Sequence, residues 1–238
     1  MKMKRINIPV VMGALWSISG IAAAVPITDP VGDFLPTYVA SGRPTGADLD
    51  AVAAEVIYRP STHQFEFIGT LAGAIGTTPG AGGESPLYVW GVDRGQGTER
   101  FLSSTPSIGH GVAFDSVVIL RPNSTANVNL FGLGGGSTNL PAGTALINGN
   151  TISAFLDETL LPSLGKNFGE YTWNFWPRFG AGLNTQISDF APNEASGAID
   201  AANARVTVPE PSSLALLGIG ALAFVRQRQK RGRGNQRG

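Results

Sequence analysis

Cysteine is absent from all 238 residues of this chain. The absence excludes disulfide bonds, thiolate metal sites and cysteine nucleophiles. A domain of this sequence that works outside the cell must therefore be held together by its hydrophobic core.

Histidine is almost absent as well, and this narrows the catalytic possibilities. The two histidines, His63 and His110, fall in expected turns or loops. The chain has no Gly-x-Ser-x-Gly elbow and no His-Glu-x-x-His motif. The glycine-rich stretch 132–136 lacks the following helix and the Lys-Ser/Thr pair of a phosphate-binding loop. A serine triad assembled from distant positions stays open, but the sequence favours a protein that is not an enzyme.

Charged residues are few and unevenly distributed. All 17 acidic residues lie between residues 25 and 211, whereas nine of the 17 basic residues lie outside this range. The body of the chain therefore has eight basic and 17 acidic residues, a net charge of −9. This charge argues against nucleic acid as a partner, because phosphates bind to basic surfaces. It is compatible with cation binding and with solubility outside the cell.

The first 24 residues have the features of a secretory signal peptide. A short basic segment, 1–5, precedes a mostly apolar segment, 6–21, and three alanines follow at 22–24. We expect signal peptidase to cleave after Ala24, so these residues are excluded from the fold. The alternative, an uncleaved N-terminal anchor, would need a longer unbroken apolar run.

The C-terminal residues 208–238 combine three features in a fixed order. Pro209-Glu210-Pro211 comes first and stays extended, because its two prolines cannot enter a helix interior. The uncharged run Leu214–Val225 follows, and six basic residues with no acidic residue come last. We expect a single transmembrane helix with its basic end in the cytoplasm. The run gives only about 18 Å of helix, so flanking serines and snorkelling arginines must help it to span. A buried C-terminal helix is the alternative.

This C-terminus resembles that of PEP-CTERM proteins, which are exported by Gram-negative bacteria and read by an exosortase, a transpeptidase-like membrane enzyme. The resemblance covers about an eighth of the chain. It implies a sorting motif formed by Pro209, Glu210 and Pro211, with exosortase and signal peptidase as partners during export. It also implies anchoring in the inner membrane before processing, and a final location at the cell surface or outside the cell.

The body, residues 25–191, reads as a single antiparallel β-sandwich of a jelly-roll-like kind. Most of the 32 glycines and 16 prolines of the chain lie in this region and indicate many short elements joined by turns, so we expect about eight to ten strands. Alternation in Gln64–Leu71 predicts a half-buried strand, paired with 51–58 as a hairpin. Asn148-Gly149 predicts a second hairpin, and the run 117–119 predicts burial on both faces. Residues 192–207 are expected to form a stalk, although Ala204–Val208 could instead close the sheet.

Four aspartates near the start of the body form a candidate metal site: Asp29, Asp33, Asp48 and Asp50. Ca²⁺ binds six to eight oxygens, which clustered carboxylates and backbone carbonyls can supply. The alternative is that these residues cap turns and strand ends. The opening of the body also resembles, loosely, β-sandwich modules of the carbohydrate-binding family-9-like or DOMON-like kind.

The tryptophans of two expected strands form a candidate sugar-stacking platform. Trp90 and Trp176 are the best candidates, the latter because it falls on the opposite strand face from Trp173. Core packing is the alternative for both.

Together these features predict a structural or binding protein of the cell surface or extracellular matrix, associated with exopolysaccharide. Two alternatives stay open. One is a secreted hydrolase of polysaccharide that uses a carboxylate pair such as Asp93 and Asp115. The other is a calcium-dependent carbohydrate-binding module.

Overall fold

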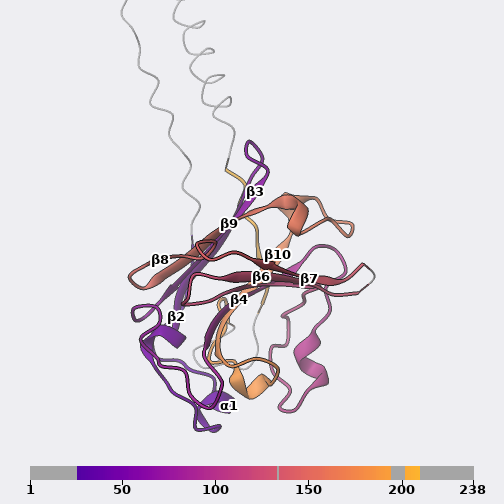
Figure 1. Cartoon of the computed structure of the whole chain (residues 1–238). Coiled ribbons are helices and arrows are strands. Elements are labelled where there is room, and N and C mark those ends of the chain that lie inside the picture. The colour runs from indigo at the N-terminus through magenta and orange to yellow at the C-terminus, as the bar shows by residue number, and fades with distance from the viewer. Residues whose placement is uncertain (1–25, 133, 194–201, 210–238) are drawn as a thin grey trace, which may run out of the picture. The chain divides into compact units, whose positions relative to one another are not determined.

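Two antiparallel sheets make up the part of the chain that the structure describes, and the prediction of a mainly β fold is confirmed (Figure 1). This computed structural model describes residues 26–132, 134–193 and 202–209. The expected signal peptide and the apolar run Leu214–Val225 lie outside these ranges.

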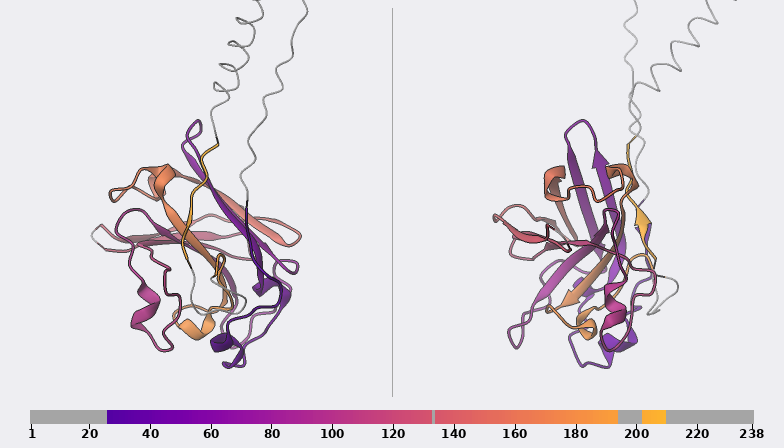
Figure 2. Two further views of the ribbon diagram at one scale, coloured as in Figure 1. Left: turned by 180° about the vertical axis from the view of Figure 1, so that it is seen from behind. Right: turned by 90° about the vertical axis from the view of Figure 1, so that its right-hand side faces the viewer.

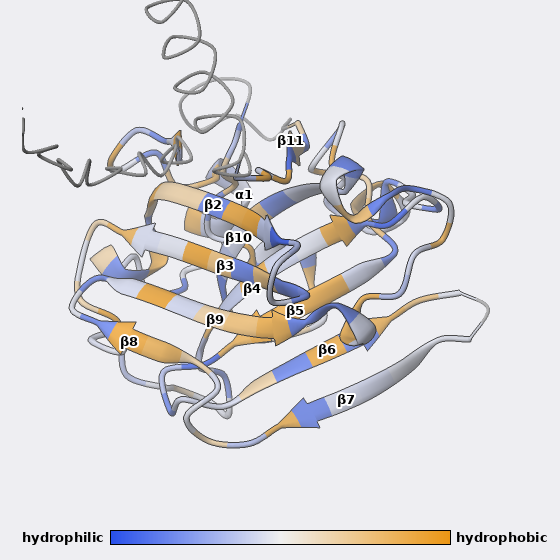
Figure 3. Cartoon of the chain, turned by 90° about the horizontal axis from the view of Figure 1, so that it is seen from above, coloured by the Kyte–Doolittle hydropathy of each residue, from blue (hydrophilic) through white to orange (hydrophobic). Residues whose placement is uncertain are grey.

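The first sheet has five strands in the order β1-β2-β3-β9-β8. Both predicted hairpins are confirmed here: β2 pairs with β3, and β8 pairs with β9 around Gly149, whose φ is 60°. Figure 3 shows four of these strands side by side, with β6 and β7 beyond their edge. The bounds are β1 Ile27–Thr28, β2 Ala51–Arg59, β3 Gln64–Leu71, β8 Leu146–Asn148 and β9 Thr151–Asp157.

The second sheet has six strands in the order β11-β10-β4-β5-β6-β7. The described residues thus contain eleven strands, more than expected, because β1 and β11 are very short and β7 occupies a stretch not predicted as a strand. Two further views show the path of these strands (Figure 2). The bounds are β4 Pro86–Asp93, β5 Ser116–Leu120, β6 Ala126–Leu130, β7 Gly136–Leu140, β10 Thr172–Phe179 and β11 Ala204–Arg205.

Helical structure in the described residues is confined to single turns. The α-helix α1 covers Pro36–Val39 and starts with a proline, which is favourable at that position. The remaining turns are 3₁₀ helices: η1 Ala47–Leu49, η2 Arg100–Ser103, η3 Glu158–Leu160, η4 Phe168–Glu170 and η5 Asn184–Gln186. In these ranges no helix has both the length and the apolar composition needed to cross a bilayer.

One hydrophobic core lies between the two sheets. Phe65, Phe67 and Leu71 of β3 all point into it, as the alternating pattern predicted. Trp90 of β4 packs against Phe175 of β10, with ring centroids 4.5 Å apart. A Cβ atom at position 69 of β3 would lie 2.8 Å from the Phe175 ring, so only glycine fits there.

A second hydrophobic core covers the opposite face of the six-stranded sheet. Its members come from β4, β5, β10 and the long loops around them: Leu35, Tyr38, Leu49, Leu87, Val89, Phe101, Ile108, Val112, Phe114, Val117, Trp176, Phe179, Ile187 and Phe190. Val117 and Val118 therefore both lie in a core, on opposite faces of β5, which confirms the predicted two-sided burial. The loops act as a third layer, so the strands β4, β5 and β10 are buried on both faces, whereas the edge strand β7 is exposed.

The last part of the expected stalk belongs to the folded body. Residues Ala204 and Arg205 pair with β10, and the Thr207 backbone exchanges hydrogen bonds of 2.8 and 2.9 Å with Tyr58 and Val56 of β2. This segment thus contacts both sheets. The stalk prediction is wrong for residues 204–207, because the open edges of β10 and β2 offer backbone partners to an extended chain.

Candidate functional site

Four buried or half-buried aspartates gather where the N-terminal segment meets the two sheets. Asp29, Asp33 and Asp189 each have a carboxylate oxygen within 4.8 Å of the other two. Asp50, at the start of β2, accepts a 2.8 Å hydrogen bond from the Gly32 N–H and so holds the loop that carries Asp29 and Asp33. We call these four residues the acidic cluster. Three of them were predicted to act together, whereas Asp189 was missed because it lies 139 residues beyond Asp50.

The chain itself supplies some hydrogen-bond donors to the acidic cluster. Asp189 accepts from the backbone N–H groups of Ala51 and Phe190 at 3.0 and 2.8 Å, and Asp33 accepts from the Asn193 side chain at 3.0 Å. In contrast, Oδ2 of Asp29 and Oδ1 of Asp50 are buried and have no hydrogen-bond partner among the described residues.

The electrostatics of the acidic cluster reflect this crowding. Burial and the neighbouring Asp33 raise the pKa of Asp29 to about 8. Burial, followed by the charges of Asp29 and Asp33, raises the pKa of Asp189 well above its usual range. Burial also raises the pKa of Asp50, against the hydrogen bond from Gly32. All three shifts mean that burial and mutual repulsion disfavour the ionised carboxylates.

Asp48, the fourth residue of the predicted metal site, does not join the acidic cluster. Its carboxylate accepts hydrogen bonds from the backbone N–H of Gly76 and Thr78 at 3.1 and 3.0 Å, and from the Thr78 hydroxyl. The Tyr88 hydroxyl lies 3.5 Å away. Asp48 therefore fixes the loop before β4, which matches the capping alternative for this residue.

The predicted stacking role of Trp90 and Trp176 is wrong, because neither ring faces solvent. Their exposed fractions are 0% and 1%. Trp176 does lie on the opposite strand face from Trp173, as expected, but the second core covers that face. Gly91 makes room for it, since a Cβ at that position would lie 2.2 Å from the indole. Both tryptophans are core residues.

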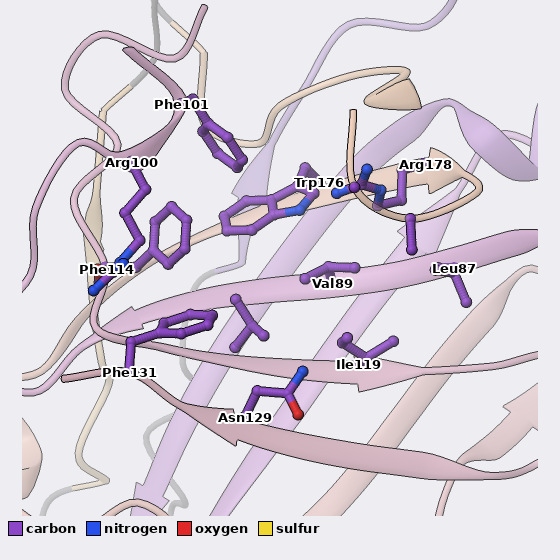
Figure 4. A pocket seen from close by; sticks show the side chains of 13 residues that line it. Leu87, Val89, Arg100, Phe101, Phe114, Ile119, Asn129, Phe131, Trp176 and Arg178 are labelled. Atoms are coloured by element: carbon purple, nitrogen blue, oxygen red, sulfur yellow. Dashed lines mark hydrogen bonds between the residues drawn. The ribbon is translucent and has the colours of Figure 1, made fainter. Parts of the chain in front are cut away.

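A cavity of about 390 Å³ opens next to Trp176 in the second core (Figure 4). Its walls are almost entirely apolar, and Arg100 lies over the Phe131 ring at 4.5 Å from the centroid. Arg178 is held by the Gly180 carbonyl at 2.7 Å, and burial lowers its pKa to about 10. Such walls suit an apolar group better than a sugar, whose hydroxyls need polar partners.

The carboxylates of the hydrolase alternative are both engaged in structural contacts. Asp115 and Arg94 form a buried ion pair of 2.7 Å, and the Arg94 and Gln96 N–H groups also bind Asp115. Asp93 contacts Lys166 at 2.5 Å. Although burial would raise the pKa of Asp93, the hydrogen bond from Lys166 and those from two backbone N–H groups lower it. The pair thus stabilises loops, and the structure gives it no role as a catalytic pair.

The two histidines are exposed, as their expected loop positions imply. His63 contacts Glu158 at 3.1 Å and has a φ of 55°, which places it in a tight turn.

The sorting motif begins directly after the last residues that pair with the body. Val206 is buried and Thr207 is hydrogen-bonded to β2, so Pro209 is only two residues beyond the sheet. Glu210 and Pro211 lie outside the described residues.

Comparison with known proteins supports the assignment of this segment. Residues 207–230 match the model of the PEP-CTERM protein-sorting motif. No curated protein matches the sequence significantly. The chain therefore carries a PEP-CTERM protein-sorting motif at residues 207–230, and this motif indicates sorting by an exosortase to the outside of the cell.

Proposed function

We propose that this protein is a structural or binding component of the cell surface or extracellular matrix, associated with exopolysaccharide, and has no catalytic activity of its own. The observation that carries the proposal is the match of residues 207–230 to the PEP-CTERM motif. The two-sheet body, which we interpret as a jelly-roll-like β-sandwich, supports it as a scaffold.

The proposed route has three steps. Signal peptidase removes residues 1–24 after export across the inner membrane of a Gram-negative bacterium. The run Leu214–Val225 then holds the body in that membrane as a single helix, with the basic tail in the cytoplasm. Exosortase finally processes the chain at Pro209, Glu210 and Pro211 and releases the body to the surface.

The contacts of the carboxylates and histidines that were considered for catalysis are consistent with a role without catalysis. Asp93 and Asp115 are ion-paired, and the two histidines are exposed in loops. The structure thus offers no support for the pair suggested for a hydrolase.

A calcium-dependent carbohydrate-binding module is the second candidate, and only the acidic cluster favours it. The burial of Trp90 and Trp176 removes the stacking platform on which sugar binding was predicted. A glycan array with the exported protein separates this candidate from a purely structural role.

The sorting step is tested by mass spectrometry of the C-terminus in a host with a working exosortase. The wild-type protein at the cell surface should lack its basic tail. The variant Glu210→Gln, which removes the carboxylate between the prolines, should keep the tail and remain in the inner-membrane fraction. Glu99→Gln, at an exposed carboxylate of the body, is the matched control and should be processed like wild type. A surface-exposed wild-type chain that still ends at Gly238 would contradict the proposal.

A further inference from the structure

The cavity beside Trp176 has the size of a site for a small organic molecule. Its volume of about 390 Å³ falls within the range of about 300–1,000 Å³ that is typical of ligand sites. Aliphatic side chains of β4 and β5 line it, together with aromatic rings of η2, of β10 and of two loops (Figure 4). Three residues that line it, Arg100, Ala181 and Gly182, are exposed, so a ligand can enter from solvent.

The indole nitrogen of Trp176 is a buried hydrogen-bond donor without an acceptor. Its side chain is 1% exposed, and Nε1 has no hydrogen-bond partner among the described residues. Figure 4 shows Nε1 on the edge of the ring that is nearer to Arg178 than to Arg100. Nε1 of Trp90 also lacks a partner, but Trp90 does not line the cavity. Because buried tryptophans usually find an acceptor, a ligand that carries one would complete the surroundings of Trp176.

Arg178 provides a positive charge on the same side of β10. Alternate residues of a strand face the same side of a sheet, and Arg178 and Trp176 both line the cavity. Nε of Arg178 donates to the Gly180 carbonyl at 2.7 Å, and Nη2 donates to the Leu183 carbonyl and to Gln186, both at 3.0 Å. Nη1 makes no hydrogen bond within the part of the chain that the structure describes, so it can donate to a ligand.

The charge of Arg178 is not balanced by a carboxylate of its own. Within the described ranges, no acidic side chain lies at ion-pair distance from it, and none lines the cavity. Glu84, whose charge acts on Arg178, is already ion-paired with Arg43 at 3.0 Å. Arg100 is exposed, so water solvates its charge, whereas Arg178 is half-buried and burial lowers its pKa to about 10. The two arginines thus differ, and Arg178 is the one that needs an anionic partner.

We propose that this cavity binds a small monocarboxylate with an apolar body, whose carboxylate pairs with Arg178 and accepts a hydrogen bond from Nε1 of Trp176. The apolar body lies against the Phe114 and Phe131 rings and the Ile119 side chain. A carboxylate suits the guanidinium because charge-assisted hydrogen bonds are about twice as strong as neutral ones. A neutral ligand would leave the charge of Arg178 unbalanced. The site goes beyond the proposed sorting function and is independent of it.

The test uses the full chain in lipid nanodiscs, with empty nanodiscs as the reference for binding to lipid. The probes are hydrocinnamate, which has an aromatic body, and octanoate, which has an aliphatic one. NMR of the indole N–H groups follows each titration, and the variant Trp176→Phe identifies the signal of Trp176. We expect saturable binding of hydrocinnamate that shifts this signal. The neutral analogue hydrocinnamyl alcohol should bind at least about tenfold more weakly, because hydrogen bonds to charged groups contribute more than neutral ones.

Three variants locate the ligand in the cavity. Arg178→Gln should weaken the binding of hydrocinnamate at least about tenfold. Arg205→Gln, at an exposed arginine of β11 that does not line the cavity, is the matched control and should keep the wild-type Kd. Because Arg178 also holds the loop that contains Gly180, Ile119→Phe provides a second variant that leaves the arginine in place. It narrows the cavity from a half-buried position on β5 and should abolish binding.

Two results would overturn the proposal. In the first, neither hydrocinnamate nor octanoate at millimolar concentration binds to the protein more than to empty nanodiscs. In the second, the alcohol binds as tightly as the acid, or Ile119→Phe keeps the wild-type Kd for hydrocinnamate. Either result leaves the exosortase experiment unaffected, because that experiment depends on Glu210 and not on the body.

Discussion

Asp48 and Asp50 are separated by a single residue and are almost equally buried, with exposed fractions of 0% and 3%, but their surroundings differ completely. The Asp48 carboxylate is surrounded by N–H and O–H donors from the loop before β4. The Asp50 carboxylate has one backbone donor and faces other carboxylates. Residues only two positions apart, one inside η1 and one just after it, can therefore have very different surroundings.

The difference follows from what each side chain is packed against. Asp48 and its donors occupy a loop that the chain folds back on itself, so hydrogen bonds replace the lost water. Asp50 lies where three segments converge, and each of them contributes an aspartate. Burial and mutual repulsion disfavour the ionised state of these carboxylates, so the pKa values of Asp29, Asp50 and Asp189 are raised.

The largest effect is expected where a buried carboxylate loses its ion-pair partner. Arg94→Met would leave Asp115 buried and without the arginine that pairs with it. Removal of one partner of such a buried pair typically lowers the free energy of unfolding of a protein by about 3–5 kcal/mol. Denaturant titration of the purified chain measures this loss. A loss below about 1 kcal/mol would show that Asp115 gains other compensation, and would weaken the contrast with the acidic cluster.

A smaller effect is expected for Asp48→Ala, which leaves the N–H groups of Gly76 and Thr78 without their acceptor. A buried group without its partner costs about 1–3 kcal/mol. Denaturant titration checks this value. A loss as large as that of Arg94→Met would show that hydrogen bonds to a buried carboxylate contribute as much as an ion pair.

The smallest effect is expected at the partly exposed ion pair of Lys166 and Asp93, whose side chains are 30% and 14% exposed. Lys166→Met should cost less than about 1 kcal/mol, because solvent weakens the pair and two backbone N–H groups still bind Asp93. The loss should shrink further at high salt. A loss of stability as large as that of Arg94→Met would show that burial does not decide how much each ion pair contributes to the free energy of unfolding.

The predictions made from local patterns were mostly confirmed. Alternation placed Phe65 and Phe67 on the buried face of β3, and Asn148-Gly149 marked the turn between β8 and β9. These features depend on neighbours in the sequence, such as strand periodicity and the positive φ of a turn glycine. The sorting motif is a local pattern too, and residues 207–230 match it.

The predictions that depended on distant contacts were partly wrong. Trp176 was correctly placed on the opposite face from Trp173, but its exposure depended on whether anything covers that face. The loops that carry Phe101, Phe114 and Phe190 cover the face of β10 on which Trp176 lies. A sequence pattern shows which face of a strand a residue occupies, but not which distant segment packs on that face.

The sequence by itself thus determined the β class, the two hairpins and the C-terminal sorting motif, because each is encoded by residues next to one another. Only the tertiary structure decided which aspartates lie together, since Asp189 joins Asp29 and Asp33 from the far end of the body while Asp48 turns to the loop before β4. It also decided that residues 204–207 close onto the sheets. The physical reason is that burial and electrostatic repulsion depend on distances in space, which local patterns do not fix.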